Sequence, residues 1–367
     1  MKRFLIKTVF ARGRRSMLAA GVLALALAVS AALGAVPSQA AGTTNILETG
    51  SSLLYPLFNL WVPAYAKINP SVKITTQSTG SGTGIAQSVA GIAQIGASDA
   101  YMSNALMMKH RMLNIPLCIS MQMVNYNLPG LNNRHLKLSG PVLAGMYDGK
   151  IRYWDDAAIR SLNPGVHLPH HVIIPVHRTD GSGDTFIFTQ YLSFSTPAWN
   201  NSVGYGTTVS WPAVSGGLGA EGNPGMVTAT KDNPYTVAYI GTSFQNAIVR
   251  YRLGIAMLKN RAGRFVLPSV ATAKSAAAAL VHKTPKDERL SLIFAPGLNS
   301  YPIINYEYAL IDPRQPSPEM AAQLRKLLTW AISPRGGNAA HFMRRVHFIA
   351  LPAPVVRLSS AQIAEIR

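Results

Sequence analysis

The sequence of 367 residues is short of cysteine and of charge. Cys118 is its only cysteine, so a disulfide within the chain is excluded. A catalytic thiol would need a neighbouring base, and no pattern around Cys118 supplies one, so we expect a small buried apolar side chain. Charged residues make up only 13% of the chain, against 48% hydrophobic residues, which indicates one large or two ordinary domains with sizeable cores.

Acidic residues are scarcer still, with 15 Asp and Glu against 34 Lys and Arg. Residues 1–40 hold six of the basic residues and no acidic one, so residues 41–367 keep 28 basic against 15 acidic side chains. Such an excess steers anions toward a protein. Nucleic-acid and membrane-surface binders are also basic, but here the basic residues are scattered, without a Lys/Arg run interleaved with aromatics. We therefore expect a general property of the surface and no nucleic-acid partner.

Motifs of several enzyme classes are missing as well. Without GxxxxGKS or GxxxxGKT the chain is not a P-loop nucleotide hydrolase, and without GxSxG it has no nucleophile elbow. His167, His170 and His171 form an HxxHH pattern that could contact a metal, but their proline-containing loop is typical of a solvated surface. We expect no metal site and no cofactor.

Residues 1–40 have the composition of an export signal. A basic start is followed by an apolar run from Met17 to Val36 and by small residues that suit cleavage after Ala40. A retained membrane anchor is the alternative, because the run could just span a bilayer. Arg14 and Arg15 leave a twin-arginine export route open beside the general one. A lipoprotein cysteine is missing, so we expect a periplasmic or secreted protein without a lipid anchor.

Short apolar strands alternate with helices through residues 41–367. Strand, Gly/Ser-rich loop, helix and strand follow one another, which is the pattern of an α/β fold. Residues 197–235 are rich in Gly, Pro and Ser and show few periodic segments. The predicted strands cover residues 45–47, 72–76, 92–97, 121–127, 171–177, 237–240 and 303–311, and the predicted helices cover residues 53–68, 83–90, 184–192, 271–281, 319–332 and 360–366.

Three of the loops share one design: a strand end, then glycines and hydroxyl residues, then a helix. They cover residues 50–52, 80–84 and 180–185. Such a loop points backbone N–H groups at a helix N-terminus toward an anion, and glycine lets the backbone approach closely. Taken singly, each loop could be a turn with a helix cap. Their repetition favours an anion site.

Two charged residues next to these loops indicate which anion the site would bind. Arg178 ends a buried strand, where a guanidinium could bind a tetrahedral oxyanion bidentately; a structural salt bridge with Asp180 is the alternative, and both can hold. Asp99 would repel an anion unless the anion donates a hydrogen bond. Phosphate keeps protons near neutral pH and sulfate has none, so Asp99 predicts a preference for phosphate, unless it only caps a helix.

Six segments of the chain match the motifs of one known family. They are GSSLLYPLFNLW (50–61), STGSGTGIAQ (78–87), IGASDAY (95–101), HRTDGSGDTFIFTQYLS (177–193), YPIINYEYA (301–309) and VVRLSSAQIAEI (355–366). These segments resemble the PstS phosphate-binding proteins of phosphate ABC importers, and the mycobacterial branch in particular. The first four are ligand-site motifs in that family, and they occur here in the same order.

The resemblance implies a periplasmic-binding-protein-like α/β fold of class II, with two lobes and a ligand cleft between them. Lobe I would comprise residues 41–120 and 300–367, and lobe II residues 121–299. It also implies a monomer that is not an enzyme, with inorganic phosphate and the membrane permease subunits of an ABC importer as partners. The implied phosphate ligands are Ser52, Leu53 (through its backbone N–H), Ser81 and Asp99 in lobe I, and Arg178, Ser182, Gly183 and Asp184 in lobe II, with Asp180 holding Arg178 in place.

The chain departs from the family at a few positions. Many members have Thr-Phe in place of Ser52 and Leu53, which preserves a hydroxyl and an N–H. Many have Thr in place of Asp184, so a second carboxylate would lie beside the ligand if its side chain points inward. The two-proton form of phosphate would then bind relatively better. The alternatives to a phosphate-binding transport protein are a secreted phosphatase or other hydrolase, a binder of another oxyanion, and an adhesin-like surface protein.

Overall fold

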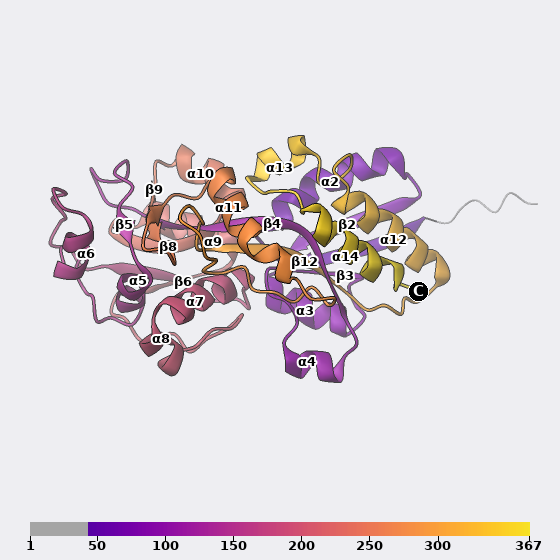
Figure 1. Ribbon diagram of the computed structural model, residues 1–367, viewed down its shortest axis with the longest axis horizontal. Helices are drawn as coiled ribbons and strands as arrows, with labels where there is room; N and C mark the ends of the chain where they lie inside the picture. The colour runs from indigo at the N-terminus through magenta and orange to yellow at the C-terminus, as the bar shows by residue number, and fades with distance from the viewer. Residues whose placement is uncertain (1–42) are drawn as a thin grey trace, which may run out of the picture. The chain divides into compact units, whose positions relative to one another are not determined.

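The computed structural model describes residues 43–367, so the predicted export signal lies outside the described residues. Residues 44–367 form one compact unit that contains a nine-stranded sheet, a three-stranded sheet and helices packed on the large sheet (Figure 1). The α/β fold expected from the sequence is confirmed.

The strands of the large sheet lie in the order β2-β1-β3-β12-β4-β8-β6-β7, and β9 pairs with β4. They are β1 (Thr44–Gly50), β2 (Val72–Ser78), β3 (Ile95–Ser98), β4 (Leu113–Tyr126), β6 (Ile174–Arg178), β7 (Leu218–Ala220), β8 (Thr236–Gly241), β9 (Gly254–Ile255) and β12 (Ile304–Ile311). The small sheet consists of β5 (Lys137–Leu138), β10 (Met257–Lys259) and β11 (Phe265–Val266). The α-helices are α2 (Tyr55–Ile68), α3 (Ser81–Val89), α4 (Asn104–Lys109), α5 (Gly140–Tyr147), α6 (Ala157–Leu162), α7 (Gly183–Ser195), α8 (Pro197–Ser202), α9 (Gly222–Asp232), α10 (Gln245–Arg250), α11 (Val270–Leu280), α12 (Pro318–Ile332), α13 (Ala340–Val346) and α14 (Ala353–Ala364).

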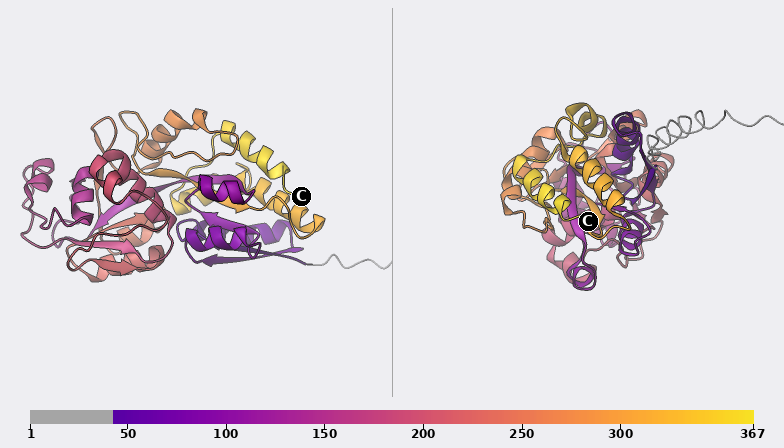
Figure 2. Two further views of the ribbon diagram at one scale, coloured as in Figure 1. Left: turned by 90° about the horizontal axis from the view of Figure 1, so that it is seen from below. Right: turned by 90° about the vertical axis from the view of Figure 1, so that its right-hand side faces the viewer.

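Strand β4 is shared by two halves of the large sheet. Its residues 113–121 pair with β12 and its residues 122–126 pair with β8, antiparallel in both cases. We call β2, β1, β3 and β12 the first half and β8, β6 and β7 the second half; β4 runs through both (Figure 1). Helices α12 and α14 pack side by side over the first half, as Figure 2 shows. Every residue of β4 is buried, because the strand is covered on both faces.

The two halves each contain parallel strands whose carboxyl ends carry the predicted loops. In the first half β1 is parallel to β2 and β3, and in the second half β6 is parallel to β7 and β8. Gly50 ends β1 with φ +138, and a side chain there would collide with the carbonyl group of Ala97 on β3. Glycine therefore allows the first Gly/Ser loop to leave the sheet against its neighbouring strand.

An aromatic cluster joins the N-terminal and C-terminal parts of the first half. The Trp61 ring on α2 lies 5.3 Å from the ring of Phe58 and 6.0 Å from the ring of Trp330 on α12, edge to face in both cases. The Trp61 indole N–H donates to the Gly337 carbonyl at 2.9 Å. Each aromatic pair is worth about 0.5–1.5 kcal/mol beyond burial, so this cluster ties together segments far apart in sequence.

Several predicted elements differ from the observed ones. Strand β4 begins at Leu113, earlier than predicted, because its fully buried first part shows no alternation of apolar and polar residues. Residues 197–235, expected to carry few elements, contain α8, β7 and α9. Helix α14 begins at Ala353, after Pro352, rather than at residue 360. Cys118 is buried, as expected.

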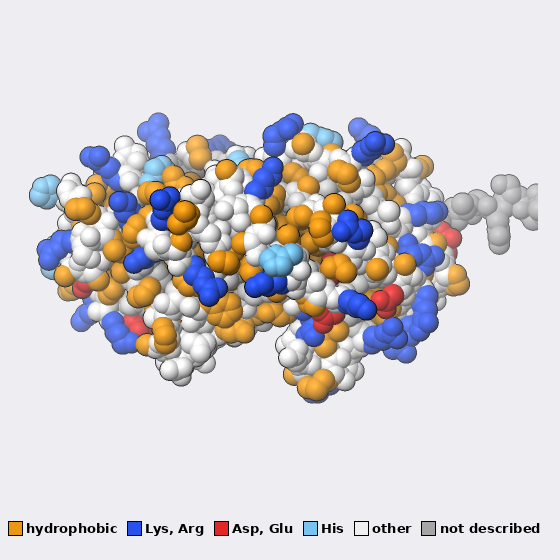
Figure 3. All heavy atoms as spheres, viewed as in Figure 1, with side chains coloured by type: hydrophobic (Ala, Val, Ile, Leu, Met, Phe, Trp, Pro, Cys, Tyr) orange, Lys and Arg blue, Asp and Glu red, His pale blue; other side chains and the backbone are white. Residues whose placement is uncertain are grey.

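Basic side chains are scattered over the face shown in Figure 3, across both halves, and few acidic side chains accompany them. This distribution agrees with a general basic surface. Within residues 43–367, no helix is long and apolar enough to cross a membrane. The same residues contain no group of three or more His, Cys, Asp and Glu side chains arranged to hold a metal ion.

Candidate functional site

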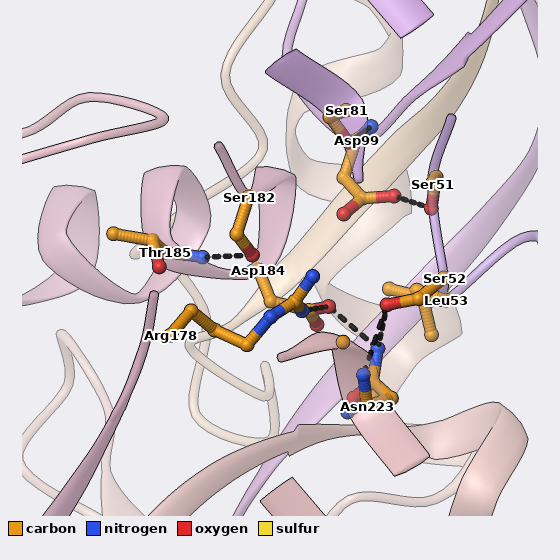
Figure 4. A network of polar contacts seen from close by, with 12 residues as sticks. Ser51, Ser52, Leu53, Ser81, Asp99, Arg178, Ser182, Asp184, Thr185 and Asn223 are labelled. Carbon is orange, nitrogen blue, oxygen red and sulfur yellow. Dashed lines mark hydrogen bonds and ion pairs between the residues drawn. The ribbon is translucent and has the colours of Figure 1, made fainter. Parts of the chain in front are cut away.

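The residues implied as ligands lie together where the loops of the first half meet those of the second half (Figure 4). All of them are buried. From the first half come Ser52 and Leu53 after β1, Ser81 at the start of α3 and Asp99 at the end of β3; from the second half come Arg178 at the end of β6, Ser182 before α7, and Gly183 and Asp184 in its first turn. The order of the strands in the sheet thus brings together, in one polar cluster, side chains that are up to 132 positions apart in the sequence.

Asp99 is a buried acceptor held by hydroxyl groups. The hydroxyl of Ser51 donates to its Oδ1, and the backbone N–H of Asp99 donates to Ser81 Oγ at 3.2 Å. Burial raises the pKa of Asp99 above its ordinary value, against the lowering effects of hydrogen bonds and of the Arg178 charge. Asp99 does not cap α4, because Ser103 takes that place and accepts from Leu106 N at 3.2 Å.

Arg178 is a buried guanidinium that holds two carboxylates. Its Nε donates to Asp180 Oδ1 at 2.7 Å, its Nη2 donates to Asp180 Oδ2, and its Nη1 donates to Asp184 Oδ2 at 2.8 Å. Partial burial would raise the pKa of Asp180, but the hydrogen bonds and charge of Arg178 outweigh it, and this pKa lies below its ordinary value. Within the described part of the chain, these contacts engage three of the five guanidinium N–H groups, which leaves two for an oxyanion.

Asp184 is fixed by protein donors on both oxygens. Besides Arg178, its Oδ2 accepts from Asn223 Nδ2 at 2.6 Å, and its Oδ1 accepts from Gln122 Nε2 at 3.1 Å. Burial and the nearby charge of Asp99 raise the pKa of Asp184 to about 7, although Arg178 lowers it. Both carboxyl oxygens of Asp184 thus already accept hydrogen bonds from the protein. The carboxyl group serves mainly to orient Arg178 rather than to accept a hydrogen bond from a ligand.

The first turn of α7 lies directly against Asp99. Ser182 caps this helix, with its Oγ accepting from Thr185 N at 3.1 Å. A side chain at Gly183 would collide with Asp99 Oδ2 and with Ser81 Oγ, so glycine lets the helix N-terminus reach the carboxyl group. The positive end of the helix dipole therefore faces the centre of the site.

Asn223, at the start of α9, is a site residue that the sequence did not reveal. Its Nδ2 donates to Ser52 Oγ at 2.9 Å as well as to Asp184, and its backbone N–H donates to Ser52 Oγ at 3.0 Å. Asn223 therefore links the first half to the second. The segment Gly222-Asn223-Pro224, a polar residue between two turn formers, was the one available signal, and it lies in the stretch expected to carry few elements.

Two Gly/Ser loops, one from each half, touch backbone to backbone. Gly82 N donates to Gly181 O at 2.7 Å. A side chain at Gly82 would come within 2.9 Å of Gly181 Cα, and one at Gly80, where φ is +87, would come within 2.5 Å of Asp180 Oδ2. These contacts need glycine, and they hold the two halves in close apposition.

Comparison with known proteins places this architecture in a family. The PBP superfamily domain matches residues 35–335. The phosphate-binding protein PstS of Methanocaldococcus jannaschii is 34% identical over 343 residues, covering 88% of this chain and 87% of the relative. The PstS protein of Pasteurella multocida is 34% identical over 339 residues, covering 92% of this chain and 94% of the relative.

The expected closeness to the mycobacterial branch is wrong. The phosphate-binding protein PstS 3 of Mycobacterium leprae is 29% identical over 215 residues and covers only 56% of each chain, so it is a more distant relative than the two above. Short shared motifs around the ligand site suggested the mycobacterial branch. Sequence identity over most of the chain instead points to PstS proteins such as those of Methanocaldococcus jannaschii and Pasteurella multocida.

Solved structures share the fold at low sequence identity. A phosphate-binding protein from Stenotrophomonas maltophilia has a TM-score of 0.66 at 18% identity, covering 87% of this chain and 93% of that one. A substrate-binding protein of a phosphate ABC transporter from Clostridium perfringens, with bound phosphate, has a TM-score of 0.59 at 15% identity, covering 84% of this chain and all of that one. The sequence relatives and the superfamily match show that the chain belongs to the PstS family of phosphate-binding proteins within the PBP superfamily.

Proposed function

We propose that this protein binds inorganic phosphate outside the cytoplasmic membrane and delivers it to the permease subunits of a phosphate ABC importer. The observation that carries the proposal is the meeting of a buried acceptor, Asp99, with a buried cation, Arg178, contributed by the two halves of the sheet (Figure 4). The names of the relatives and the bound phosphate of the Clostridium perfringens protein support the same ligand. The protein acts as a binding protein and catalyses no reaction.

The residues proposed to bind phosphate are the hydrogen-bond donors and acceptors that lie where the two halves of the sheet meet. Arg178 supplies two N–H groups, the α7 N-terminus supplies the N–H groups of Gly183 and Asp184, and Ser81 and Ser182 supply hydroxyls. Ser52 and the backbone N–H of Leu53 complete the set from the first half. Asp99 accepts a hydrogen bond from a protonated oxygen of the anion, and no cofactor takes part.

Two lobes that close on the anion are part of the proposal. Lobe I consists of residues 41–120 and 300–367, and lobe II consists of residues 121–299. The change of partner along β4, from β12 up to residue 121 to β8 from residue 122, supports a boundary there. Because each lobe supplies only part of the coordination, phosphate favours the closed arrangement by its differential affinity.

The proposed mature protein is a monomer that lies in the periplasm or is secreted, without a lipid anchor. Titration calorimetry of the purified chain with phosphate, arsenate, sulfate and molybdate tests the ligand, and turnover of a chromogenic phosphate ester tests for catalysis. We expect tight binding of phosphate, exclusion of sulfate and no turnover. Exclusion of phosphate, or steady hydrolysis of the ester, would refute the proposal.

Asp99→Asn is expected to narrow the preference for phosphate over sulfate by roughly 10- to 100-fold, because an amide can donate to an anion that carries no proton. Competition calorimetry with the two anions at pH 7 measures the ratio. Asp232→Asn, at the exposed C-terminal end of α9, makes the same chemical change away from the site and should leave the ratio unchanged. Continued full exclusion of sulfate by Asp99→Asn would show that another group sets the selectivity.

Gly82→Ala is expected to weaken phosphate binding by roughly one to two orders of magnitude, since overpacking a tight contact costs about 1–3 kcal/mol. The added methyl group would lie 2.9 Å from Gly181 Cα and would hold the two loops apart. Gly225→Ala is the matched control, because its methyl group would make ordinary contacts of 3.6 Å or more with Ala220. Small-angle scattering should show a more open phosphate-bound state for Gly82→Ala; unchanged affinity would mean that the loop contact plays no part in closure.

A further inference from the structure

Glu307 is a buried carboxyl group that the proposed function leaves unused. It lies on β12 and is 0% exposed. In the antiparallel pairing of β12 with β3, Tyr308 lies opposite Ser98. One position further, Glu307 therefore lies opposite Asp99, which directly follows β3. Opposite residues of an antiparallel pair point their side chains to the same face, and the charge of Asp99 acts on the carboxyl group of Glu307.

The pairing of β12 with β4 is irregular next to this side chain. The register between β12 and β4 shifts between Glu307 and Tyr308, with Glu307 opposite Cys118 and Tyr308 opposite Pro116. Bulges of this kind re-aim a side chain and are common next to functional sites. Here the extra residue, Leu117, lies on β4 beside the position of Glu307.

The contact between the two carboxyl groups requires a proton. Two buried carboxylates in contact cannot both be ionised. Glu307 Oε1 accepts from Ser120 Oγ at 2.5 Å, but Glu307 Oε2 is buried and finds no donor among residues 43–367. A proton on Oε2 removes that deficit, because the O–H can donate to Asp99.

The proton belongs on Glu307 rather than on Asp99. Asp99 accepts from the hydroxyl of Ser51 and experiences the charge of Arg178, both of which favour its ionised form. Burial, then the charge of Asp99, raises the pKa of Glu307 well above its ordinary value. Glu307 is therefore neutral while Asp99 is a carboxylate.

The titratable groups around Glu307 do not supply an alternative partner. Cys118, opposite on β4, is a neutral thiol because burial raises its pKa. Helix α3, which also packs on β12, carries no titratable side chain, and the only one on α11 is the exposed Lys274. Arg178 and Asp184, across the site, are paired with each other.

We propose that Glu307 is a positioning residue that carries a proton, donates it in a hydrogen bond to Asp99, and thereby keeps Asp99 a hydrogen-bond acceptor toward phosphate. The inference rests on the proposed function, since it explains how the acceptor stays ionised in a buried site. Without the donor, burial would favour the protonated form of Asp99, which could then donate to sulfate.

Two variants at one position separate this role from simple packing. Glu307→Gln keeps a donor toward Asp99 and an acceptor for Ser120, so phosphate affinity should stay within about threefold of the wild type and sulfate should stay excluded. Glu307→Leu fills a similar volume without a donor, so the ratio of phosphate to sulfate affinity should fall about tenfold or more at pH 7 and recover at higher pH. Glu48→Gln, a buried carboxyl held by Thr76 instead, is the matched control.

The measurements are calorimetric titrations with phosphate and sulfate from pH 5 to 8.5, together with infrared difference spectra of wild type against Glu307→Gln at pH 7. The difference spectrum should contain the carbonyl stretch of a neutral carboxylic acid. Carboxylate bands in its place, sulfate binding by Glu307→Gln, or unchanged selectivity in Glu307→Leu would each overturn the inference while phosphate binding by the wild type still stood. Failure of the wild type to bind phosphate would overturn the proposed function itself.

Discussion

Arg178→Met is expected to lower phosphate affinity by roughly two to four orders of magnitude, because truncating one partner of a buried, hydrogen-bonded charge pair costs about 2–5 kcal/mol of binding free energy. The substitution removes the two N–H groups proposed for the anion. It also leaves the carboxyl groups of Asp180 and Asp184 without the cation that holds them. Titration calorimetry with phosphate at pH 7 measures the loss.

Two further variants separate lost binding from lost folding. Arg178→Lys keeps the charge but cannot hold Asp180 and Asp184 together in one planar fork, so it should recover only part of the affinity. The double variant Arg178→Met with Asp184→Asn removes a buried carboxyl left without its cation, so it should regain thermal stability without regaining affinity. Phosphate binding by Arg178→Met within tenfold of wild type would place the anion elsewhere.

The protein is expected to be more stable at pH 5 than at pH 8, the reverse of ordinary acid denaturation. Burial raises the pKa of both Glu48 and Glu288 from the ordinary value of 4.5 to about 8. Between these values the folded chain binds more protons than the unfolded chain, so the free energy of unfolding falls as pH rises from about 4.5 to 8. Each group contributes on the order of several kcal/mol over that range, at about 1.4 kcal/mol per pKa unit.

Thermal unfolding in phosphate-free buffers at half-unit steps from pH 4.5 to 8.5 tests this expectation. The midpoint should be about 5 °C or more higher at pH 5 than at pH 8. Glu48→Gln should flatten the profile, because an amide does not ionise, whereas Glu365→Gln at a half-exposed side chain should leave its slope unchanged. A midpoint that rises steadily with pH would show that these buried groups do not control stability. Asp180 acts in the opposite direction, since its pKa is lowered, but only at pH values below its ordinary pKa.

Local sequence patterns predicted the parts of the site that depend on neighbours in the chain. The Gly/Ser loops, the strand that ends at Arg178 and the pairing of Arg178 with Asp180 all lie within a few residues of one another. A strand followed by glycines and a helix has one common geometry, so its residues show where the backbone N–H groups point.

The contacts across the sheet could not be predicted in this way. Asn223 meets Ser52 across 171 residues, and Glu307 meets Ser120 across 187 residues, through strand register that no local pattern encodes. The segment that carries Asn223 showed no periodicity in the sequence, although it begins a helix in the structure. The sequence predicted that Asp184 lies in the site, but not which residues hold it. Its donors Asn223 and Gln122 come from distant elements.

The strand order has a consequence for the order in which the chain can fold. β12 lies between β3 and β4, so β1, β2 and β3 cannot join the rest of the sheet until residues 304–311 are in place. The second half, by contrast, is built from residues 122–241 in one continuous stretch. Because distant pairings close large loops before they gain contacts, the second half can form early during synthesis, while the N-terminal strands must wait for β12, which is made more than 200 residues after β3.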